Sequence, residues 1–419
     1  MDATTDRHQS TWLCASVLVV VYLIGAALFA VNTPFPTEFD ELAHLSYIKA
    51  MRDDPAFIAH QDRISLLNGD NLDEWTDQQN YLSHPPAFYS LASVLIGEHI
   101  DRTDIVAIRI FSVTLGAFAI LLVITALISR MTTDAGFLTG ASLMALCPMA
   151  SVVAGSVGND VVSLVAGALA LLASLRLLDR GPGYGSALLA GLAFVVAALT
   201  KLNAGLLVGL YLLAVHVIAI RDWPGCQAQW LRHIITVIVF GLIGMSPYLT
   251  NLVEIGAVIP VDLSSHAAQI AGSEPWNFWR YTKWFVEALG TTWSAYEPAD
   301  ALERTHLLFL VGLSVVACWF SLSRTSLWIA VSALAALVVV LPIHLAFAYD
   351  LHVERLHLSA AQSRYYLALL PILSFAAAAA VDGIRQKTVQ LSIAGIVVFL
   401  CFYASLMPAV VRTFYLGRG

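Results

Sequence analysis

Long apolar stretches separated by short polar links dominate the pattern along this chain. A helix needs about 20 apolar residues to cross the hydrocarbon core of a bilayer. The pattern therefore predicts an all-α polytopic membrane protein with about eleven transmembrane helices, in a range of 10 to 13. The expected spans are Thr11–Val31, Val106–Ser129, Ala135–Val152, Val161–Leu178, Tyr184–Leu199, Ala204–Ile220, Ile234–Leu249, Leu307–Phe320, Leu327–Phe347, Tyr365–Ala380 and Leu391–Val411.

One apolar stretch, Pro85–Gly97, is too short for a span and is better suited to a helix lying at the membrane interface. It lies in a polar loop over residues 32–105, and a second polar loop covers residues 251–305. We expect residues 1–419 to form a single transmembrane domain without a soluble domain. The first apolar segment is expected to stay uncleaved, because it is long for a signal sequence and no small-residue cleavage site follows it.

Composition agrees with a membrane protein. Hydrophobic residues make up 58% of the chain and charged residues only 12%, against about 25% in soluble domains. The formal net charge of −7 gives no basic surface for nucleic acid. The five cysteines show no spacing typical of disulfides or zinc ligands.

Positive charge predicts the orientation in the cell membrane. Lys and Arg concentrate in the short links 130–134, 176–183, 221–232 and 382–388, which places these links and the N-terminus in the cytoplasm. Both polar loops then face the outside. One chemically rich face is more typical of an enzyme or receptor than of a symmetric carrier.

An acidic cluster follows the first span, in the stretch "TEFDELAHLSYIKAM" from Thr37 to Met51. Asp40 and Glu41 stand beside apolar neighbours, and a carboxylate that is partly desolvated there can act as a general base. Glu41 and His44 also form an E-x-x-H pair on one helical face, as some metal sites do. A single copy is a weak metal signal, so a divalent metal is an alternative that we do not expect, and no cofactor is assigned.

Further polar residues on the same face are candidates for binding a substrate. Lys201 and Arg364 stand at the starts of apolar helices, where a cation and free backbone amides suit a phosphate, although snorkelling or topology marking explains them equally well. Asn159 and Asp160 suit helix capping as well as binding. The stretch "YLSHPPAFY" places Tyr81 and His84 before a double proline that starts a helix.

An aromatic stretch from Trp276 to Tyr296 is typical of a helix lying in the membrane interface. An aromatic belt is the simpler interpretation. The alternative is a groove wall for an isoprenoid chain.

Five of these stretches together resemble the GT-C superfamily of membrane glycosyltransferases, which use polyprenyl-phosphate-linked sugars. "TEFDELAHLSYI" is similar to the acidic motif in the first outer loop of protein O-mannosyltransferases and aminoarabinose transferases. "SHPPAFYSLASVLIG", "CPMASVVAGSVGND", "LTKLNAGLL" and "SRYYLALLPIL" follow in the order in which this superfamily has its similar motifs. The resemblance covers residues 11 to about 380.

The resemblance implies roles for individual residues. Asp40 matches the catalytic base and Glu41 its support, while Arg364 and Lys201 match cations that hold the donor phosphate. His84 matches a histidine near the sugar; with His44, Tyr81, Asn159, Asp160 and Tyr365 it completes the expected donor site. The implied reaction is a single inverting displacement from the lipid-linked donor to a glycan, lipid or protein acceptor.

Two other classes stay open. A flippase or transporter of lipid-linked sugars would need polar groups within its spans and an internal repeat, and neither is evident. A membrane metalloprotease would need more ligands than one E-x-x-H pair provides.

Overall fold

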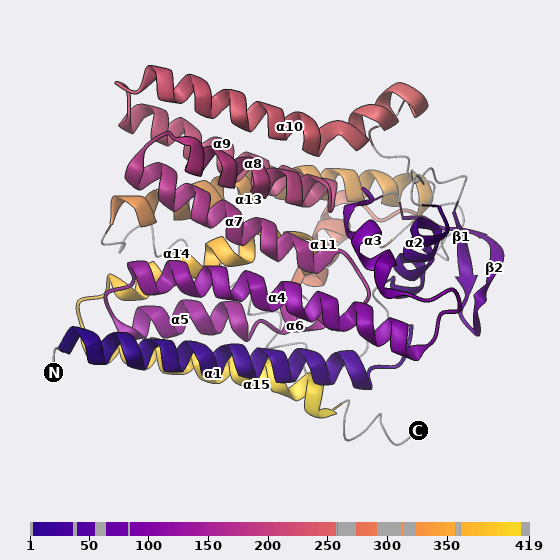
Figure 1. Cartoon of the computed structure of the whole chain (residues 1–419), viewed down its shortest axis with the longest axis horizontal. Helices are drawn as coiled ribbons and strands as arrows, with labels where there is room; N and C mark the ends of the chain where they lie inside the picture. Colours follow the sequence, from indigo (N-terminus) through magenta and orange to yellow (C-terminus); the bar gives the residue numbers. More distant parts are fainter. Residues whose placement is uncertain are drawn as a thin grey trace.

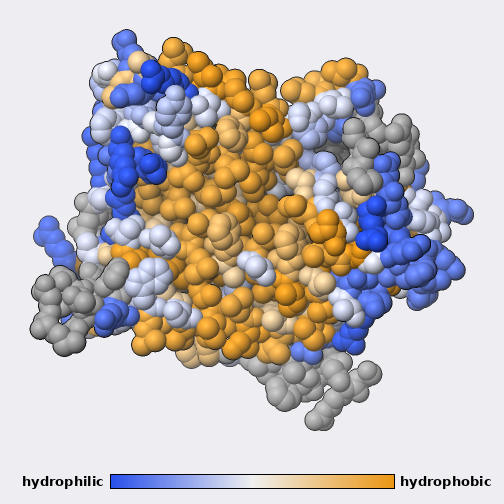
Figure 2. All heavy atoms as spheres, in the orientation of Figure 1, coloured by the Kyte–Doolittle hydropathy of each residue, from blue (hydrophilic) through white to orange (hydrophobic). Residues whose placement is uncertain are grey.

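The structure is a computed structural model that describes residues 3–36, 40–54, 64–82, 84–256, 258, 274–290, 312, 323–356, 358 and 362–411. Helices of different lengths run side by side along its longest axis (Figure 1). They are α1 (Ala3–Asn32), α4 (Arg102–Arg130), α5 (Asp134–Ala145), α6 (Pro148–Ala154), α7 (Asp160–Arg180), α8 (Tyr184–Ala198), α9 (Leu202–Asp222), α10 (Gln227–Ile255), α13 (Arg324–Arg355), α14 (Leu370–Asp382) and α15 (Lys387–Val411). The surface shows a broad apolar band with polar residues at both ends of the bundle (Figure 2).

The predicted membrane bundle is confirmed. Within the described residues, eight helical segments are long and apolar enough to cross a membrane, and α8 and Lys387–Tyr403 are shorter apolar helices. These segments correspond to ten of the predicted spans. The remaining one, Leu307–Phe320, lies outside the described residues except for Gly312.

Two predicted spans are less regular than the apolar pattern suggests. The pattern predicts one helix over Ala135–Val152, but α5 ends at Ala145 and α6 starts at Pro148. Proline disfavours the helical conformation of the residue before it, and Cys147 is accordingly extended. The span at Tyr365–Ala380 begins with a 3-10 helix, η3 (Ser363–Leu369), and continues as α14, with Pro371 in its first turn.

The end of the bundle opposite the N-terminus carries a small polar layer, which we call the α2 end (Figure 1). It contains α2 (Glu41–Asp53), α3 (Ala87–Ala92), the 3-10 helix η2 (Ser93–Leu95) and an antiparallel hairpin of β1 (Ser65–Asn68) and β2 (Asn71–Gln79). The helical part of the Pro85–Gly97 segment, α3 followed by η2, is too short to cross the membrane. The hairpin was not predicted, although Gly69-Asp70, the pair of residues between the two strands, is a recognised turn signal.

At the opposite end of the bundle, the short basic links contact one another. Arg130 pairs with Asp179, and Arg324 pairs with Asp222 at 2.6 Å. The Asp382 carboxylate accepts hydrogen bonds from the backbone amides of Thr132 and Thr133 and from both hydroxyls. The links that the charge pattern assigned to one side therefore do lie together.

The described part of the second polar loop forms α11 (Phe278–Gly290). Tyr281 and Phe285 are buried against the bundle, whereas the Trp279 side chain is exposed. The stretch from residue 291 to residue 305, which contains the last predicted aromatic residues, lies outside the described residues.

Candidate functional site

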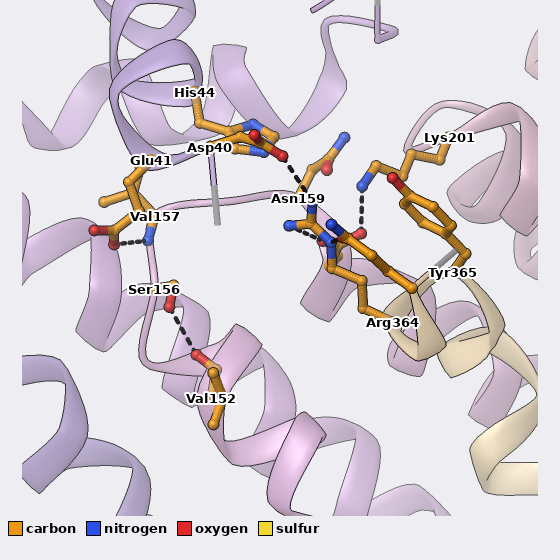
Figure 3. A network of polar contacts seen from close by, with 12 residues as sticks. Asp40, Glu41, His44, Val152, Ser156, Val157, Asn159, Lys201, Arg364 and Tyr365 are labelled. Atoms are coloured by element: carbon orange, nitrogen blue, oxygen red, sulfur yellow. Dashed lines mark hydrogen bonds and ion pairs between the residues drawn. The ribbon is translucent and has the colours of Figure 1, made fainter. Parts of the chain in front are cut away.

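Four charged side chains from distant parts of the chain meet at the α2 end. Asp40 precedes α2, Asp160 begins α7, Lys201 precedes α9, and Arg364 belongs to η3. Arg364 lies between Asp40 on one side and Lys201 with Tyr365 on the other (Figure 3). All four were candidates from the sequence, and the structure brings them together.

Asp40 has an unusual backbone that turns its carboxylate into this cluster. It occupies the N-cap position of α2 with φ 60° and ψ 21°, in the left-handed region, and its side chain makes no capping hydrogen bond. Aspartate is one of the few residues that tolerates this conformation. Its Oδ1 instead accepts from the Tyr81 hydroxyl at 2.7 Å, and its Oδ2 accepts from Arg364 Nη2 at 2.7 Å.

The other contacts of Arg364 extend the cluster. Arg364 Nη1 lies 3.3 Å from Asp160 Oδ2, and Lys201 Nζ lies 2.5 Å from Asp160 Oδ1. The Gln362 side chain accepts from Arg364 Nε. The two acids and two cations therefore alternate in one continuous chain of contacts.

Close packing and two amide side chains position the cations. A Cβ on Gly167 would overlap the Ala368 carbonyl oxygen, so the glycine allows η3 to lie directly against α7. Asn203 on α9 donates to the Tyr365 carbonyl at 2.9 Å, which joins α9 to η3. Asn159 donates to the Thr200 carbonyl at 2.8 Å, so it joins two turns rather than capping α7.

The electrostatics keep Asp40 ionised in the free protein. Burial raises the pKa of the Asp40 carboxyl, but the Arg364 guanidinium and the Tyr81 hydroxyl stabilise its charged form more strongly, so its pKa lies well below the usual range. Burial and the nearby Asp40 charge raise the pKa of Tyr81, so its hydroxyl stays protonated as a donor. About 25% of the Asp40 side chain is exposed, against 5% for Asp160 and none of Glu41.

Glu41 lies next to Asp40 in sequence but points away from this cluster (Figure 3). Arg109 holds its two oxygens at 2.9 and 2.7 Å, and the Val157 amide donates to it at 2.6 Å. Arg109 also donates to the carbonyls of Ala30, Thr33 and Pro34 at the end of α1. We call this group the Glu41–Arg109 clamp; it fixes the ends of α1, α2 and α6 to α4.

The histidines form a stacked aromatic group beside the charges. The rings of His44 and His84 are stacked with centroids 6.0 Å apart, and His44 Nδ1 is 2.8 Å from the Tyr89 hydroxyl. Burial lowers the pKa of His44 to about 3, and the Lys201 ammonium adds to the decrease. Burial and Lys201 also lower the pKa of His84, so both rings are neutral at pH 7.

The E-x-x-H pair is divided between different partners. Glu41 belongs to the clamp and His44 to the stacked rings. Across the described residues, no three His, Cys, Asp or Glu side chains are grouped so that they could hold a metal ion.

Tyr365 completes the cluster as an aromatic neighbour of both cations. Its ring centroid is 5.4 Å from Lys201 Nζ and 5.7 Å from Arg364 Cζ. These are distances at which a cation is attracted to a ring.

Sequence reasoning missed three residues that hold the site in place. Arg109 is the clearest, and its signal was a lone arginine inside the apolar segment Val106–Ser129, because a charge at membrane depth needs a buried partner. Asn203 and Gln362 gave no comparable signal, since a polar residue next to a helix start is common.

The fold agrees with that of known membrane proteins. ArnT from Cupriavidus metallidurans, solved bound to undecaprenyl phosphate, superposes with a TM-score of 0.54 at 16% identity over 94% of this chain. The chain has the ArnT fold. An apo oligosaccharyltransferase from Archaeoglobus fulgidus gives a TM-score of 0.46 at 14% identity over 95% of this chain. No protein-family model and no curated protein matches the sequence.

The chain is shorter than these structural neighbours. It corresponds to 63% of the ArnT chain and to 56% of the oligosaccharyltransferase chain. The likeness to ArnT confirms the predicted fold, an all-α membrane bundle. The activity rests on the site.

Proposed function

We propose that this protein transfers a sugar from a polyprenyl-phosphate-linked donor to an acceptor at the outer face of the cell membrane. The observation that carries the proposal is the Asp40–Arg364 contact, because the partly exposed Asp40 side chain there contacts a cation of a buried two-cation cluster. The carboxylate suits a general base, and the two cations suit a phosphate leaving group. The ArnT fold supports the same reading, since that protein was solved with undecaprenyl phosphate bound.

The reaction is a single displacement. The acceptor oxygen attacks the anomeric carbon as its proton passes to Asp40 Oδ1 or Oδ2. The bond between the anomeric carbon and the phosphate oxygen breaks, and its electron pair stays on the phosphate beside Arg364 and Lys201. One displacement inverts the anomeric centre, as in inverting glycosidases.

Donor binding makes Asp40 a better base. In the free protein Arg364 stabilises the charged carboxylate, and a carboxylate with such a low pKa accepts a proton poorly. A phosphate that takes over part of the Arg364 guanidinium weakens this contact. Asp40 then accepts a proton more readily once the donor is in place.

The remaining residues hold and shape the site. Tyr81 orients the Asp40 carboxylate, and Tyr365 provides a ring against the cations. His44 and His84 form a neutral wall at which a sugar ring can lie. Glu41 supports Asp40 indirectly, because the clamp fixes the start of α2.

Two alternatives are weaker on this geometry. A transporter would bring its charges into the middle of the spans, but this cluster lies at one end of the bundle. A metal-dependent reaction would have to break the Glu41–Arg109 contact at 2.7 Å before Glu41 became a ligand.

The orientation is tested by labelling. Cys226 precedes α10 at the opposite end, and Glu74 on β2 is exposed at the α2 end. A membrane-impermeant thiol reagent on whole cells should label Glu74→Cys in a Cys226→Ser background and leave Cys226 of the wild type unlabelled. The reverse pattern would place the site in the cytoplasm and contradict the proposal.

The activity is tested by lipid analysis of a deletion strain. The unused sugar–phosphate lipid should accumulate when the gene is removed. Wild-type protein should return it to its normal level, and Asp40→Asn protein at equal abundance should not. An unchanged pool of lipid-linked sugars in the deletion strain would contradict the proposed function.

A further inference from the structure

Asp160 occupies the place between the two cations that a phosphate group would suit. One of its carboxylate oxygens lies 2.5 Å from Lys201 Nζ, and the other lies 3.3 Å from Arg364 Nη1. Its side chain is only 5% exposed, and those of Lys201 and Arg364 are 6% and 3% exposed. A buried acid with both oxygens on the cations competes with any anionic ligand for them.

The charges of the cluster cancel in the free protein. Asp40 and Asp160 balance Lys201 and Arg364. The neighbouring His44 and His84 rings are neutral because burial and Lys201 lower their pKa values. Every negative charge brought by a ligand is therefore an excess over this balance.

We propose that Asp160 makes the site discriminate by phosphate charge, so that it holds a monoanionic phosphodiester and releases a dianionic phosphomonoester. The inference rests on the proposed function, in which the donor is a phosphodiester and the spent lipid is a monoester. A monoester carries close to two negative charges above its second pKa of about 6. Asp160 is thus a specificity residue that favours release of the product lipid.

The same arrangement does not oppose the transfer itself. The bond that breaks adds one negative charge to the phosphate, while the acceptor proton neutralises Asp40. The cluster with its ligand carries one net negative charge before and after this step. The repulsion rises only when Asp40 loses its proton to solvent, and it then acts on the product lipid alone.

Electrostatics sets the size of the expected effect. At an effective dielectric constant of about 20, one unit charge about 5 Å from another changes its binding by a few hundred-fold, roughly. Solvent on the Asp40 side of the cluster screens part of this interaction between charges. Removing the Asp160 charge should therefore favour the monoester over the diester by about 10- to 100-fold.

Farnesyl phosphate and its methyl diester test this with equal lipid chains and different charge. Their dissociation constants are measured by calorimetry on detergent-purified protein at pH 8, for wild type and Asp160→Asn. Asp179→Asn is the matched control, because Asp179 lies on the same helix at the opposite end and contacts Arg130 and Thr325. Wild type should bind the diester more tightly, Asp160→Asn should reverse or erase this preference, and Asp179→Asn should retain it.

The outcomes separate the two proposals. An equal gain of affinity for both lipids in Asp160→Asn, or a loss for both, overturns the charge discrimination and leaves the phosphate site standing. Wild type that binds neither lipid overturns the proposed function and this inference with it. If Asp160→Asn does not fold, a wild type that prefers the monoester still overturns the inference.

Discussion

Asp40 and Glu41 are neighbours in sequence, and each is held by a buried arginine, but the two pairs differ in every property that matters for chemistry. The Glu41 side chain is fully buried, and all five N–H groups of Arg109 can be accounted for by Glu41 and three backbone carbonyls. The Asp40 side chain is 25% exposed, and Arg364 is shared among Asp40, Asp160 and Gln362.

This difference is consistent with the proposed roles, in which Asp40 is the base and Glu41 supports it. In the Glu41–Arg109 pair, every hydrogen-bond donor of the arginine has a partner inside the protein. The pair therefore has no free donor for a ligand, and it holds the surrounding helices together. The Asp40–Arg364 pair, with a partly exposed acid and a cation that several residues share, can exchange its partners for a ligand. The left-handed backbone at Asp40 strengthens this view, because strained conformations concentrate at functional sites.

The largest expected effect separates the two acids by activity. Asp40→Asn keeps the shape but removes the proton acceptor, so turnover should fall by about 10²–10⁴-fold. The affinity for the anionic donor should not fall, because the substitution also removes a negative charge that contacts Arg364 at 2.7 Å. Glu41→Gln should lower turnover less, and mainly through lost stability. Both are measured as single-turnover rates with a purified lipid-linked donor. A fully active Asp40→Asn protein would exclude Asp40 as the base.

The next effect separates the two arginines by stability. Arg109→Met leaves Glu41 buried without its partner and should destabilise the protein by about 3–5 kcal/mol. Replacing both members, as Glu41→Leu with Arg109→Met, should recover part of this because no lone charge remains. Melting in detergent measures both. If Arg109→Met has the same melting temperature as the wild type, the clamp does not stabilise the fold.

A smaller effect concerns the neutral His44. Its folded pKa of about 3 lies below the unfolded value near 6.5, so the unfolded state binds more protons between these values. Stability then falls as the pH drops through this window, by about 2 kcal/mol between pH 6.5 and pH 5. The stability advantage of wild type over His44→Gln should shrink by that amount when melting is compared at pH 7 and pH 5. A constant difference at both pH values would contradict the buried, neutral state of His44.

The smallest effect is expected at the opposite end. Arg324 pairs with Asp222, but the Arg324 side chain is 63% exposed. Exposed ion pairs contribute about 0–1 kcal/mol, so Arg324→Ala should change the melting temperature little. A loss as large as that of Arg109→Met would show that the exposed and buried pairs do not differ as proposed.

Much of the fold was predictable because it depends on local composition. Ten apolar stretches became the helices that the pattern predicted, and the basic links gathered at one end. The hairpin of β1 and β2 was missed because β2 is polar and mostly exposed, so it shows no alternation of apolar residues. The break at Pro148 was visible in the sequence but outweighed by the apolar run around it.

The sequence by itself determined that this protein is an apolar bundle with its polar chemistry concentrated at a few helix starts, because apolar length and charge placement are properties of each segment alone. Only the tertiary structure decided which charges meet. Arg364 lies 324 residues from Asp40, and Arg109 lies 68 residues from Glu41. Contacts over such separations depend on how helices pack, as where Gly167 lets η3 approach α7. Two adjacent acids thus received different partners, since Asp40 precedes α2 in a left-handed conformation while Glu41 lies in the first turn of the helix.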